Sequence, residues 1–226
     1  MISSPIEIDH IFVFVDPVPD QDPLEAYLLQ EAGFIESYRR NHPGQGTTNI
    51  CYCFDNAYLE LLWVNDEQAI RSSLISNTRL AERSQWKSNG NSPFGIALRP
   101  ELPFETWDYQ PPYLPPEMSI PVACSSLNPL QPFIFQSPGG KRPDAWSQKK
   151  PPKRQDPGKF KEIAHIELDI PVSTPLTGDL TALNKIGLIT LNQDTPHHAI
   201  RLSLTNPMGE ITHYLELPAC KVIAVD

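Results

Sequence analysis

Two histidines and two glutamates occupy corresponding places near the two ends of the chain. His10 lies in the segment Ile8-Asp9-His10-Ile11 and His165 in Ile163-Ala164-His165-Ile166, whereas Glu60 and Glu216 both stand in a Tyr-Leu-Glu-Leu tetrapeptide. The histidines are 155 residues apart and the glutamates 156. Imidazole and carboxylate groups suit a borderline divalent ion such as Zn²⁺, Ni²⁺, Mn²⁺ or Fe²⁺. The alternative is that each is a hydrogen-bonded structural group, but sheet packing does not require both residue types twice.

The N-terminal residues 7–64 predict a βαβββ unit that would position His10 and Glu60. Residues 6–15 are apolar and rich in β-formers, and Asp20 can cap a helix that carries Leu24, Leu28 and Ala32 and ends at Gly33. Three strands follow over residues 34–39, 48–54 and 57–64.

Residues 163–217 predict a second βαβββ unit around His165 and Glu216. A strand over residues 163–170 precedes a helix that opens at Thr174-Pro175, carries Leu176, Leu180 and Leu183, and stops at Gly187. Strands over residues 188–191, 199–204 and 211–217 complete the unit. The sequence thus predicts an α+β fold of paired βαβββ modules within one domain, residues 1–226.

Between the modules lies a proline-rich middle, residues 65–162, with fourteen of the 25 prolines between Pro100 and Pro157. Such a segment has few uninterrupted stretches for a core of its own, so we expect it to cover a cavity formed by the modules. An alternative is that the stretches 94–98 and 133–135 belong to a degenerate module that pairs with the first. His10 and Glu60 would then lie apart from His165 and Glu216. The aromatic residues available for a cover are Phe94, Phe104, Trp107, Tyr109, Tyr113, Phe133 and Trp146.

The overall charge argues against nucleic acid as a partner. The chain has 18 Lys and Arg against 27 Asp and Glu, a formal net charge of −9, which would repel a phosphate backbone. No stretch has the length and apolarity of a membrane span, and the N-terminus lacks the pattern of a signal peptide, so we expect a cytoplasmic protein with no membrane partner. The four cysteines form no Cys-x-x-Cys pair, which predicts reduced thiols.

Residues 141–161 hold eight of the 18 Lys and Arg. This basic segment would steer an anionic substrate toward a cavity, or it is a solvated loop with no such role.

The sequence resembles the vicinal-oxygen-chelate superfamily and, within it, the glyoxalase-like domain family. The motifs that carry the resemblance are Ile8-Asp9-His10, the run His42-Pro43-Gly44-Gln45-Gly46-Thr47-Thr48-Asn49, Tyr58-Leu59-Glu60-Leu61, the stretch 94–99 and Pro132-Phe133-Ile134. The resemblance implies two βαβββ modules whose sheets curl around a shared cavity. It also implies a divalent metal, with His10, Glu60, His165 and Glu216 as its ligands, although some members keep the fold without a functional metal.

Two functions follow from the resemblance. The first is a metal-dependent isomerase, lyase or dioxygenase for a small molecule with adjacent oxygens, in which Glu60 or Glu216 serves as general base. His42, Asn49, Tyr58 and Tyr214 would contact this substrate. The second is a metal-free protein that binds or sequesters a small molecule of the antibiotic type, as a homodimer with shared pockets.

Overall fold

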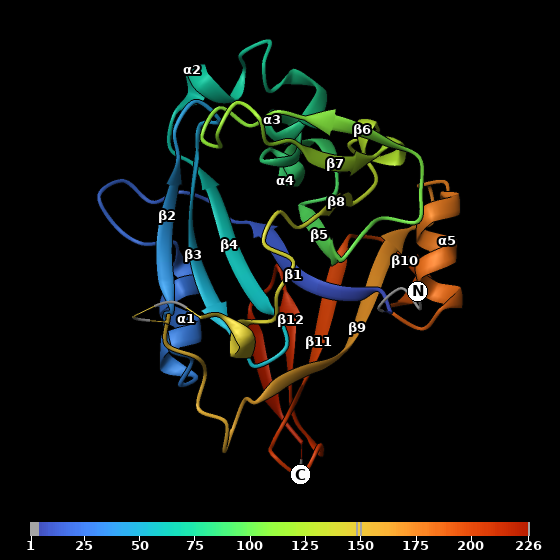
Figure 1. Ribbon diagram of the computed structural model, residues 1–226. Coiled ribbons are helices and arrows are strands. Elements are labelled where there is room, and N and C mark those ends of the chain that lie inside the picture. The colour runs from blue at the N-terminus through green and yellow to red at the C-terminus, as the bar shows by residue number, and fades with distance from the viewer. Residues whose placement is uncertain (1–4, 148, 150, 226) are drawn as a thin grey trace.

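Two β-sheets that lie face to face form the body of the molecule (Figure 1). The computed structural model describes residues 5–147, 149 and 151–225. An eight-stranded sheet has the order β2-β3-β4-β1-β5-β8-β7-β6, and a five-stranded sheet has the order β10-β9-β11-β12-β13. Side chains from the facing sides of both sheets make one core, to which β1 contributes Ile11 and Val13, and β9 contributes Ile166 and Leu168. The α+β class predicted from the sequence is confirmed.

The first four strands of the large sheet come from the N-terminal unit. Its elements are β1 (Glu7–Phe14), α1 (Leu24–Glu31), β2 (Tyr38–His42), β3 (Thr47–Cys53) and β4 (Tyr58–Val64). Strand β1 pairs parallel with β4, and β4, β3 and β2 follow as antiparallel neighbours. This is the predicted βαβββ series. The helix buries Ala26 and Leu29, whereas Leu24 is 62% exposed, because the helix begins at Leu24 after Pro23 and not at Asp20.

The other four strands come from the proline-rich middle. They are β5 (Phe94–Arg99), β6 (Thr106–Tyr109), β7 (Ile120–Ala123) and β8 (Phe133–Gln136). Strand β5 pairs antiparallel with β1 and parallel with β8, so this half repeats the strand pattern of the first half, without an α-helix between β5 and β6. The middle thus provides a degenerate module that pairs with the first, as the alternative prediction had it. This proline-rich segment can still form strands because they are short, and most of its prolines lie between them or near their ends.

Short helices link the two halves of the large sheet. These are α2 (Glu67–Ile70), α3 (Leu80–Arg83) and α4 (Trp86–Asn89), with a 3₁₀ turn at Ser76–Thr78. Two further 3₁₀ turns lie between β7 and β8, at Cys124–Leu127, and after β8, at Pro143–Ala145. Arg83 is fully buried, and its guanidinium donates hydrogen bonds to main-chain carbonyls that include those of Ser126, at 2.8 Å, and Pro129, at 3.2 Å. This one side chain ties the helical segment to the loop before β8.

The C-terminal unit forms the second sheet. It contains β9 (Glu162–Pro171), α5 (Gly178–Lys185), β10 (Thr190–Thr195), β11 (Ala199–Thr205), β12 (Ile211–Leu217) and β13 (Lys221–Ala224). The helix buries the predicted Leu180 and Leu183, whereas Leu176 is exposed before its start. In this unit β9 pairs with β10 and β11, and β12 pairs with β11 and β13.

The two predicted units therefore differ in topology. In the first, the strand with His10 pairs directly with the strand that carries Glu60, whereas β11 separates the strands that carry His165 and Glu216. The Tyr-Leu-Glu-Leu repeat reflects a shared alternation of polar and apolar residues, which any half-buried strand requires. It does not identify equivalent modules.

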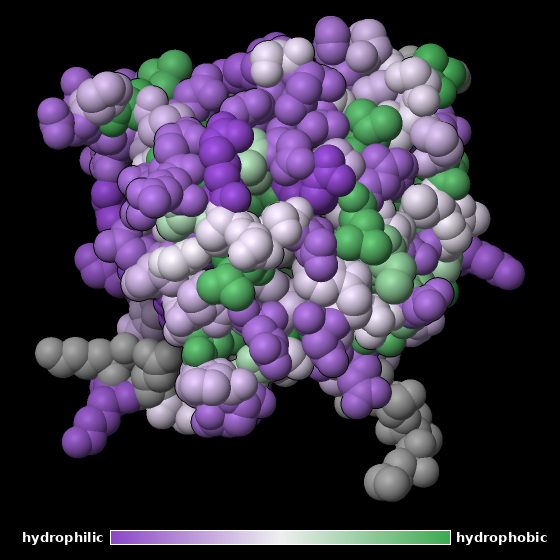
Figure 2. Space-filling view, turned by 90° about the horizontal axis from the view of Figure 1, so that it is seen from above, coloured by the Kyte–Doolittle hydropathy of each residue, from purple (hydrophilic) through white to green (hydrophobic). Residues whose placement is uncertain are grey.

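The described residues include no helix that is long and apolar enough to cross a membrane. The end of the molecule that carries α2, α3 and α4 has a mostly hydrophilic surface with scattered apolar groups (Figure 2). The four cysteines are free thiols, as predicted.

Candidate active site

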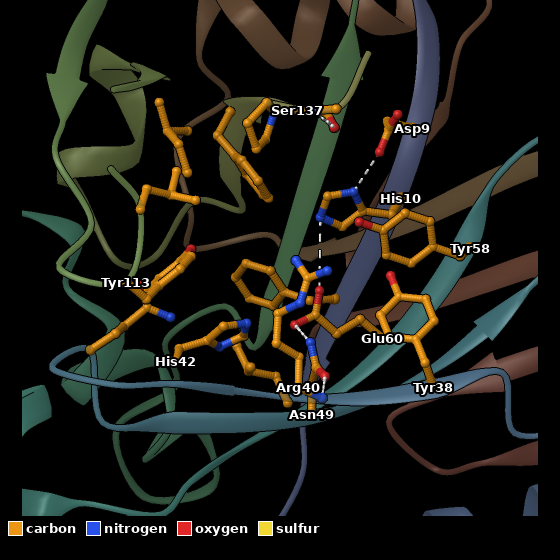
Figure 3. A pocket seen from close by; sticks show the side chains of 18 of the residues that line it. Asp9, His10, Tyr38, Arg40, His42, Asn49, Tyr58, Glu60, Tyr113 and Ser137 are labelled. Carbon is orange, nitrogen blue, oxygen red and sulfur yellow. Dashed lines mark hydrogen bonds and ion pairs between the residues drawn. The ribbon is translucent and has the colours of Figure 1, made fainter. Parts of the chain in front are cut away.

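A cavity of about 820 Å³ lies on the face of the large sheet that points away from the small sheet. Strands β1, β2, β3 and β4 supply most of its polar side chains together with Phe12 and Leu62, and strands of the β5–β8 half supply mostly apolar and aromatic ones. Successive side chains of a strand point to opposite faces, so Ile11 and Val13 enter the shared core while His10 and Phe12 line the cavity. Figure 3 shows this polar side, with His10, Glu60, Asn49 and His42 labelled.

A β-bulge places Asp9 beside His10. The pairing of β1 with β5 shifts between Ile8, opposite Leu98, and His10, opposite Ala97, so that one residue is inserted between them. Such a bulge breaks the strict alternation of the strand. The Asp9 carboxylate consequently contacts two groups, His10 Nδ1 at 2.8 Å through Oδ1 and Arg99 Nη1 at 3.0 Å through Oδ2.

The Asp9 carboxylate is held in its ionised form. Burial raises the pKa of Asp9, but hydrogen bonds from His10, Ser137 and Arg99, together with the charge of His10, lower the pKa below its ordinary value. An ionised carboxylate only accepts hydrogen bonds, so Nδ1 of His10 carries the hydrogen that bridges them. In neutral His10 the other nitrogen, Nε2, has its lone pair available.

Glu60 lies on the opposite side of the His10 ring from Asp9. Its Oε2 is 3.8 Å from His10 Nε2, which is longer than a hydrogen bond. Its Oε1 accepts a 2.7 Å hydrogen bond from Asn49 Nδ2, and Asn49 Oδ1 in turn accepts from the main-chain N–H of Arg40 at 2.9 Å. The Asn49 amide is therefore anchored at both ends, and it fixes one Glu60 oxygen while the other faces His10.

A chain of hydrogen bonds orients His42. The Tyr109 hydroxyl donates to Gln45 Oε1, Gln45 Nε2 donates to Thr47 Oγ1, and Thr47 Oγ1 lies 2.9 Å from His42 Nδ1. Burial lowers the pKa of His42, which favours its neutral form. Since Thr47 Oγ1 already accepts from Gln45, its own hydrogen is available to Nδ1 of His42. This arrangement suits a His42 that carries its hydrogen on Nε2.

Aromatic rings surround the His10 imidazole. The Tyr58 ring stacks on it at 4.3 Å between centroids, and the Phe135 ring meets it edge-on at 5.3 Å. Phe12 lies over Gly95 of β5, where any side chain would collide with its ring. Burial raises the pKa of Tyr58 well above its ordinary value, so its hydroxyl stays neutral. These contacts restrict the orientation of His10.

A comparison with known protein families matches the part of the chain that carries the polar side of the cavity. Residues 8–105 match the family model described as glyoxalase-like domain. This stretch, which is less than half of the chain, is similar to a glyoxalase-like domain. The match includes His10, His42, Asn49 and Glu60, and it confirms the resemblance predicted from the sequence.

A comparison with solved structures gives matches at low sequence identity and low TM-score. A crystal structure of a hypothetical protein from Staphylococcus aureus is 14% identical, with 94% of this chain and 85% of that chain covered and a TM-score of 0.45. Methylmalonyl-CoA epimerase in complex with methylmalonyl-CoA and NH4+ is 13% identical, with 62% and 99% covered and a TM-score of 0.37. No curated protein matches the chain.

The predicted convergence of His10, Glu60, His165 and Glu216 is wrong. His10 and Glu60 line the cavity on the large sheet, but His165 lies on the small sheet and its Nε2 contacts Thr190 Oγ1 at 2.9 Å. Glu216 forms a 2.6 Å ion pair with Arg201. Ile166 and Leu215, their neighbours in sequence, point into the shared core, so His165 and Glu216 point to the outer side of the small sheet. The core separates the two pairs.

The predicted substrate contacts divide in the same way. His42, Asn49 and Tyr58 line the cavity on the large sheet. Tyr214 lies on β12 of the small sheet, in the same outward row as Glu216, and is not among the cavity residues. The roles of Tyr214 and Glu216 at this cavity are therefore excluded by their position, whereas those of the other residues stay predictions.

The donor set of the cavity on the large sheet does not match a metal site of three or four ligands. His10 Nε2 and Glu60 Oε2 could both contact one ion, but beside them β5 and β8 present Ala97 and Phe135. Within residues 5–147, 149 and 151–225, no group of three or more His, Cys, Asp or Glu side chains is placed to hold a metal ion. A structural or catalytic zinc site normally takes three or four protein ligands. The described residues thus do not fit the expected metal.

The sequence interpretation missed three residues of the site. Asp9 was adjacent to His10 in the quoted motif, but strict alternation placed it on the other face, and only the bulge reverses this. Arg99 ends a stretch already quoted for the resemblance, and Arg40 precedes the glycine loop by a few residues. A charged residue that ends a buried strand is a signal that could have identified Arg99.

The cover predicted for the proline-rich middle is present in part. Tyr109, Tyr113, Phe133 and Trp146 line the cavity, whereas Phe94 faces the shared core. In the basic segment Lys141 lines the cavity, and Lys150 lies outside the described residues. The middle therefore contributes both part of the sheet and part of the cover.

Proposed function

We propose that the chain is an enzyme that transfers a proton at a carbon atom next to a carbonyl group of a small molecule, with His10 as the base. The contact that carries this proposal is the series Arg99, Asp9 and His10, because it fixes one ring nitrogen and leaves Nε2 toward the cavity. Isomerisation and elimination both begin with such a step. Both are among the reaction classes that the family resemblance implies.

The proton transfer would proceed without a change in oxidation state. The carbon–hydrogen bond of the substrate breaks, its electron pair moves toward the carbonyl oxygen to form an enolate, and the proton binds Nε2 of His10. The imidazolium that results lies between two carboxylates, Asp9 at 2.8 Å and Glu60 at 3.8 Å. Coulomb attraction in a partly buried site stabilises this charge. Return of the proton to the same or another atom completes an isomerisation.

His42 is the group we assign to the carbonyl oxygen. Its hydrogen-bond chain through Thr47 and Gln45 favours an N–H at Nε2, and its low pKa keeps the ring neutral. A neutral imidazole donates a hydrogen bond to a developing enolate without first having to lose a proton. His42 lines the same cavity as His10 and Glu60.

The apolar half of the cavity supports this chemistry. Phe12, Leu62, Phe133 and Phe135 line it. A bound molecule with an apolar body would displace water from these side chains, which strengthens electrostatic interactions at His10.

A second candidate is a protein that binds a small molecule without converting it. The rings of Tyr38, Tyr58 and Trp146 favour this candidate, because together they could hold a planar ligand. The centre of the Tyr58 ring lies 6.3 Å from that of Tyr38 and 6.0 Å from that of Trp146. Such a protein would need neither the ionised Asp9 nor the anchored Glu60.

The exchange of solvent deuterium into a carbonyl compound separates these candidates. We expect the wild type to catalyse exchange at C3 of 2-oxo-4-phenylbutanoate, followed by NMR, and His10→Asn to lose 10²- to 10⁴-fold in rate. His165→Asn, the matched control on the small sheet, should exchange at the wild-type rate. A wild type that binds this probe without accelerating exchange would be a binding protein.

A further inference from the structure

Two adjacent arginines of β2 have different surroundings. Arg39 forms ion pairs with Asp22, at 2.8 Å between Nη2 and Oδ2, and with Glu36, at 2.7 Å. Arg40 points to the other face of the strand and extends into the cavity (Figure 3). Among the described residues no carboxylate lies within ion-pair distance of the Arg40 guanidinium. Arg40 is thus a cation in the cavity whose charge the protein does not neutralise by a direct contact.

The position of Arg40 is tied to that of Glu60. The main-chain N–H of Arg40 donates to Asn49 Oδ1, and Asn49 Nδ2 donates to Glu60, so one amide sets the place of both residues. The Arg40 guanidinium also lies 5.7 Å from the centre of the Tyr38 ring, which limits its range of orientations. Although Arg40 is exposed, its main chain and its guanidinium are thus each restrained by a contact.

An anion that enters this cavity needs a cation to receive it. The chain carries a net charge of −9, and the carboxylates of Asp9 and Glu60 flank His10. An anionic ligand would be repelled by this field unless a cation receives it directly. A guanidinium matches a carboxylate with two parallel hydrogen bonds, which makes Arg40 suited to this class of ligand.

We infer that the cavity takes a 2-oxo acid with an apolar body. Its carboxylate would pair with Arg40, its carbonyl oxygen would face His42, and its C3 hydrogen would face His10. The apolar body would lie against Phe12, Phe133 and Phe135, in a cavity whose volume of about 820 Å³ suits a molecule of this size. This inference rests on the proposed function for its reacting carbon, but the role of Arg40 in binding is independent of catalysis.

Calorimetric titration with two probes of the same body tests the inference. The probes are 2-oxo-4-phenylbutanoate and the neutral ketone 4-phenylbutan-2-one, in which a methyl group replaces the acyl carboxylate. We expect the wild type to bind the oxo acid at least tenfold more tightly than the ketone, and Arg40→Gln to lose this preference without a change for the ketone. Arg39→Gln is the matched control and should keep the preference, and Arg40→Lys should recover part of it.

The result that would overturn the inference is an equal affinity of the wild type for both probes, no binding of the oxo acid, or an unchanged oxo-acid affinity in Arg40→Gln. A failure of the proposed function has a different signature. In that case the oxo acid binds through Arg40, and His10→Asn also binds it, but the wild type does not accelerate deuterium exchange.

Discussion

The Asp9 carboxylate lies 2.8 Å from Nδ1 of His10, although the two residues are consecutive in one strand. Consecutive side chains of a regular strand point to opposite faces, so this contact exists only because β1 bulges between Ile8 and His10. Arg99, from the neighbouring strand, holds the second Asp9 oxygen at 3.0 Å. The bulge thus supplies the group that orients the proposed base.

Replacement of Asp9 by Asn should reduce the rate of deuterium exchange by about 10- to 100-fold, because the amide no longer selects the Nδ1–H form of His10 or stabilises the imidazolium. The affinity for 2-oxo-4-phenylbutanoate should change by less than threefold. Single-turnover exchange and calorimetric titration measure the two effects separately. Equal losses of binding and exchange would show that Asp9 supports only the shape of the cavity.

Removal of divalent metal should leave the exchange activity unchanged, because among the described residues no three His, Cys, Asp or Glu side chains are placed together to hold an ion. Dialysis against a chelator followed by the exchange assay checks this expectation. A loss of activity that Zn²⁺, Ni²⁺, Mn²⁺ or Fe²⁺ restores would contradict it. His165→Ala should not alter the metal content in either case, because its imidazole lies on the small sheet.

Much of the fold could be predicted from the sequence, since the N-terminal βαβββ series follows from the strand alternation and from glycines that end helices. The site could be predicted only in part. His10 and Glu60 share a cavity because β1 and β4 are direct neighbours, but pairing between distant segments decides which other strands complete that cavity. The repeated tetrapeptide at Tyr214–Leu217 carries no information on pairing, because alternation is a local property of a strand.

Stability toward unfolding should decrease as the pH falls from 6.5 to about 4. Burial lowers the pKa of His198 to about 4 from 6.5. Between these pH values His198 is protonated in the unfolded chain but neutral in the folded chain, so proton binding favours unfolding. The cost at pH 4 is roughly 3 kcal/mol at about 1.4 kcal/mol per pH unit, and the lowered pKa of His42 acts in the same direction. Below about pH 4 the His198 contribution becomes constant.

Chemical denaturation across this pH range, with His198→Asn and its neighbour His197→Asn, measures the effect. The free energy of unfolding of His198→Asn should depend less on pH between 6.5 and 4 than that of the wild type. His197 is exposed, and its variant should keep the wild-type dependence. An identical slope in all three proteins would exclude His198 as the source.

Replacement of Arg83 by Met should lower the free energy of unfolding by about 3 kcal/mol, because the main-chain carbonyls of Ser126, Asn128 and Pro129 lose their donor. Thermal unfolding should then occur roughly 10 °C lower. Arg71→Met is a suitable control, since Arg71 is exposed and pairs only with exposed Glu67, and it should change stability by less than about 0.5 kcal/mol. Similar stabilities of the two variants would contradict the structural role of Arg83.

The two halves of the large sheet have the same strand order but unlike side chains toward the cavity. The proposed base His10, its neighbours Asp9 and Glu60, and His42 come from β1, β2 and β4. From the other half, β5 contributes Arg99, which holds Asp9, and β8 presents Phe133 and Phe135 to the cavity. In the proposed function, therefore, most of the reacting groups and these two apolar contacts come from separate stretches of the chain. Exchanges of Phe133 or Phe135 for smaller or larger residues could alter which molecules are accepted while the proton-transfer groups stay intact, so this sheet offers a scaffold in which specificity can diverge without loss of the underlying reaction.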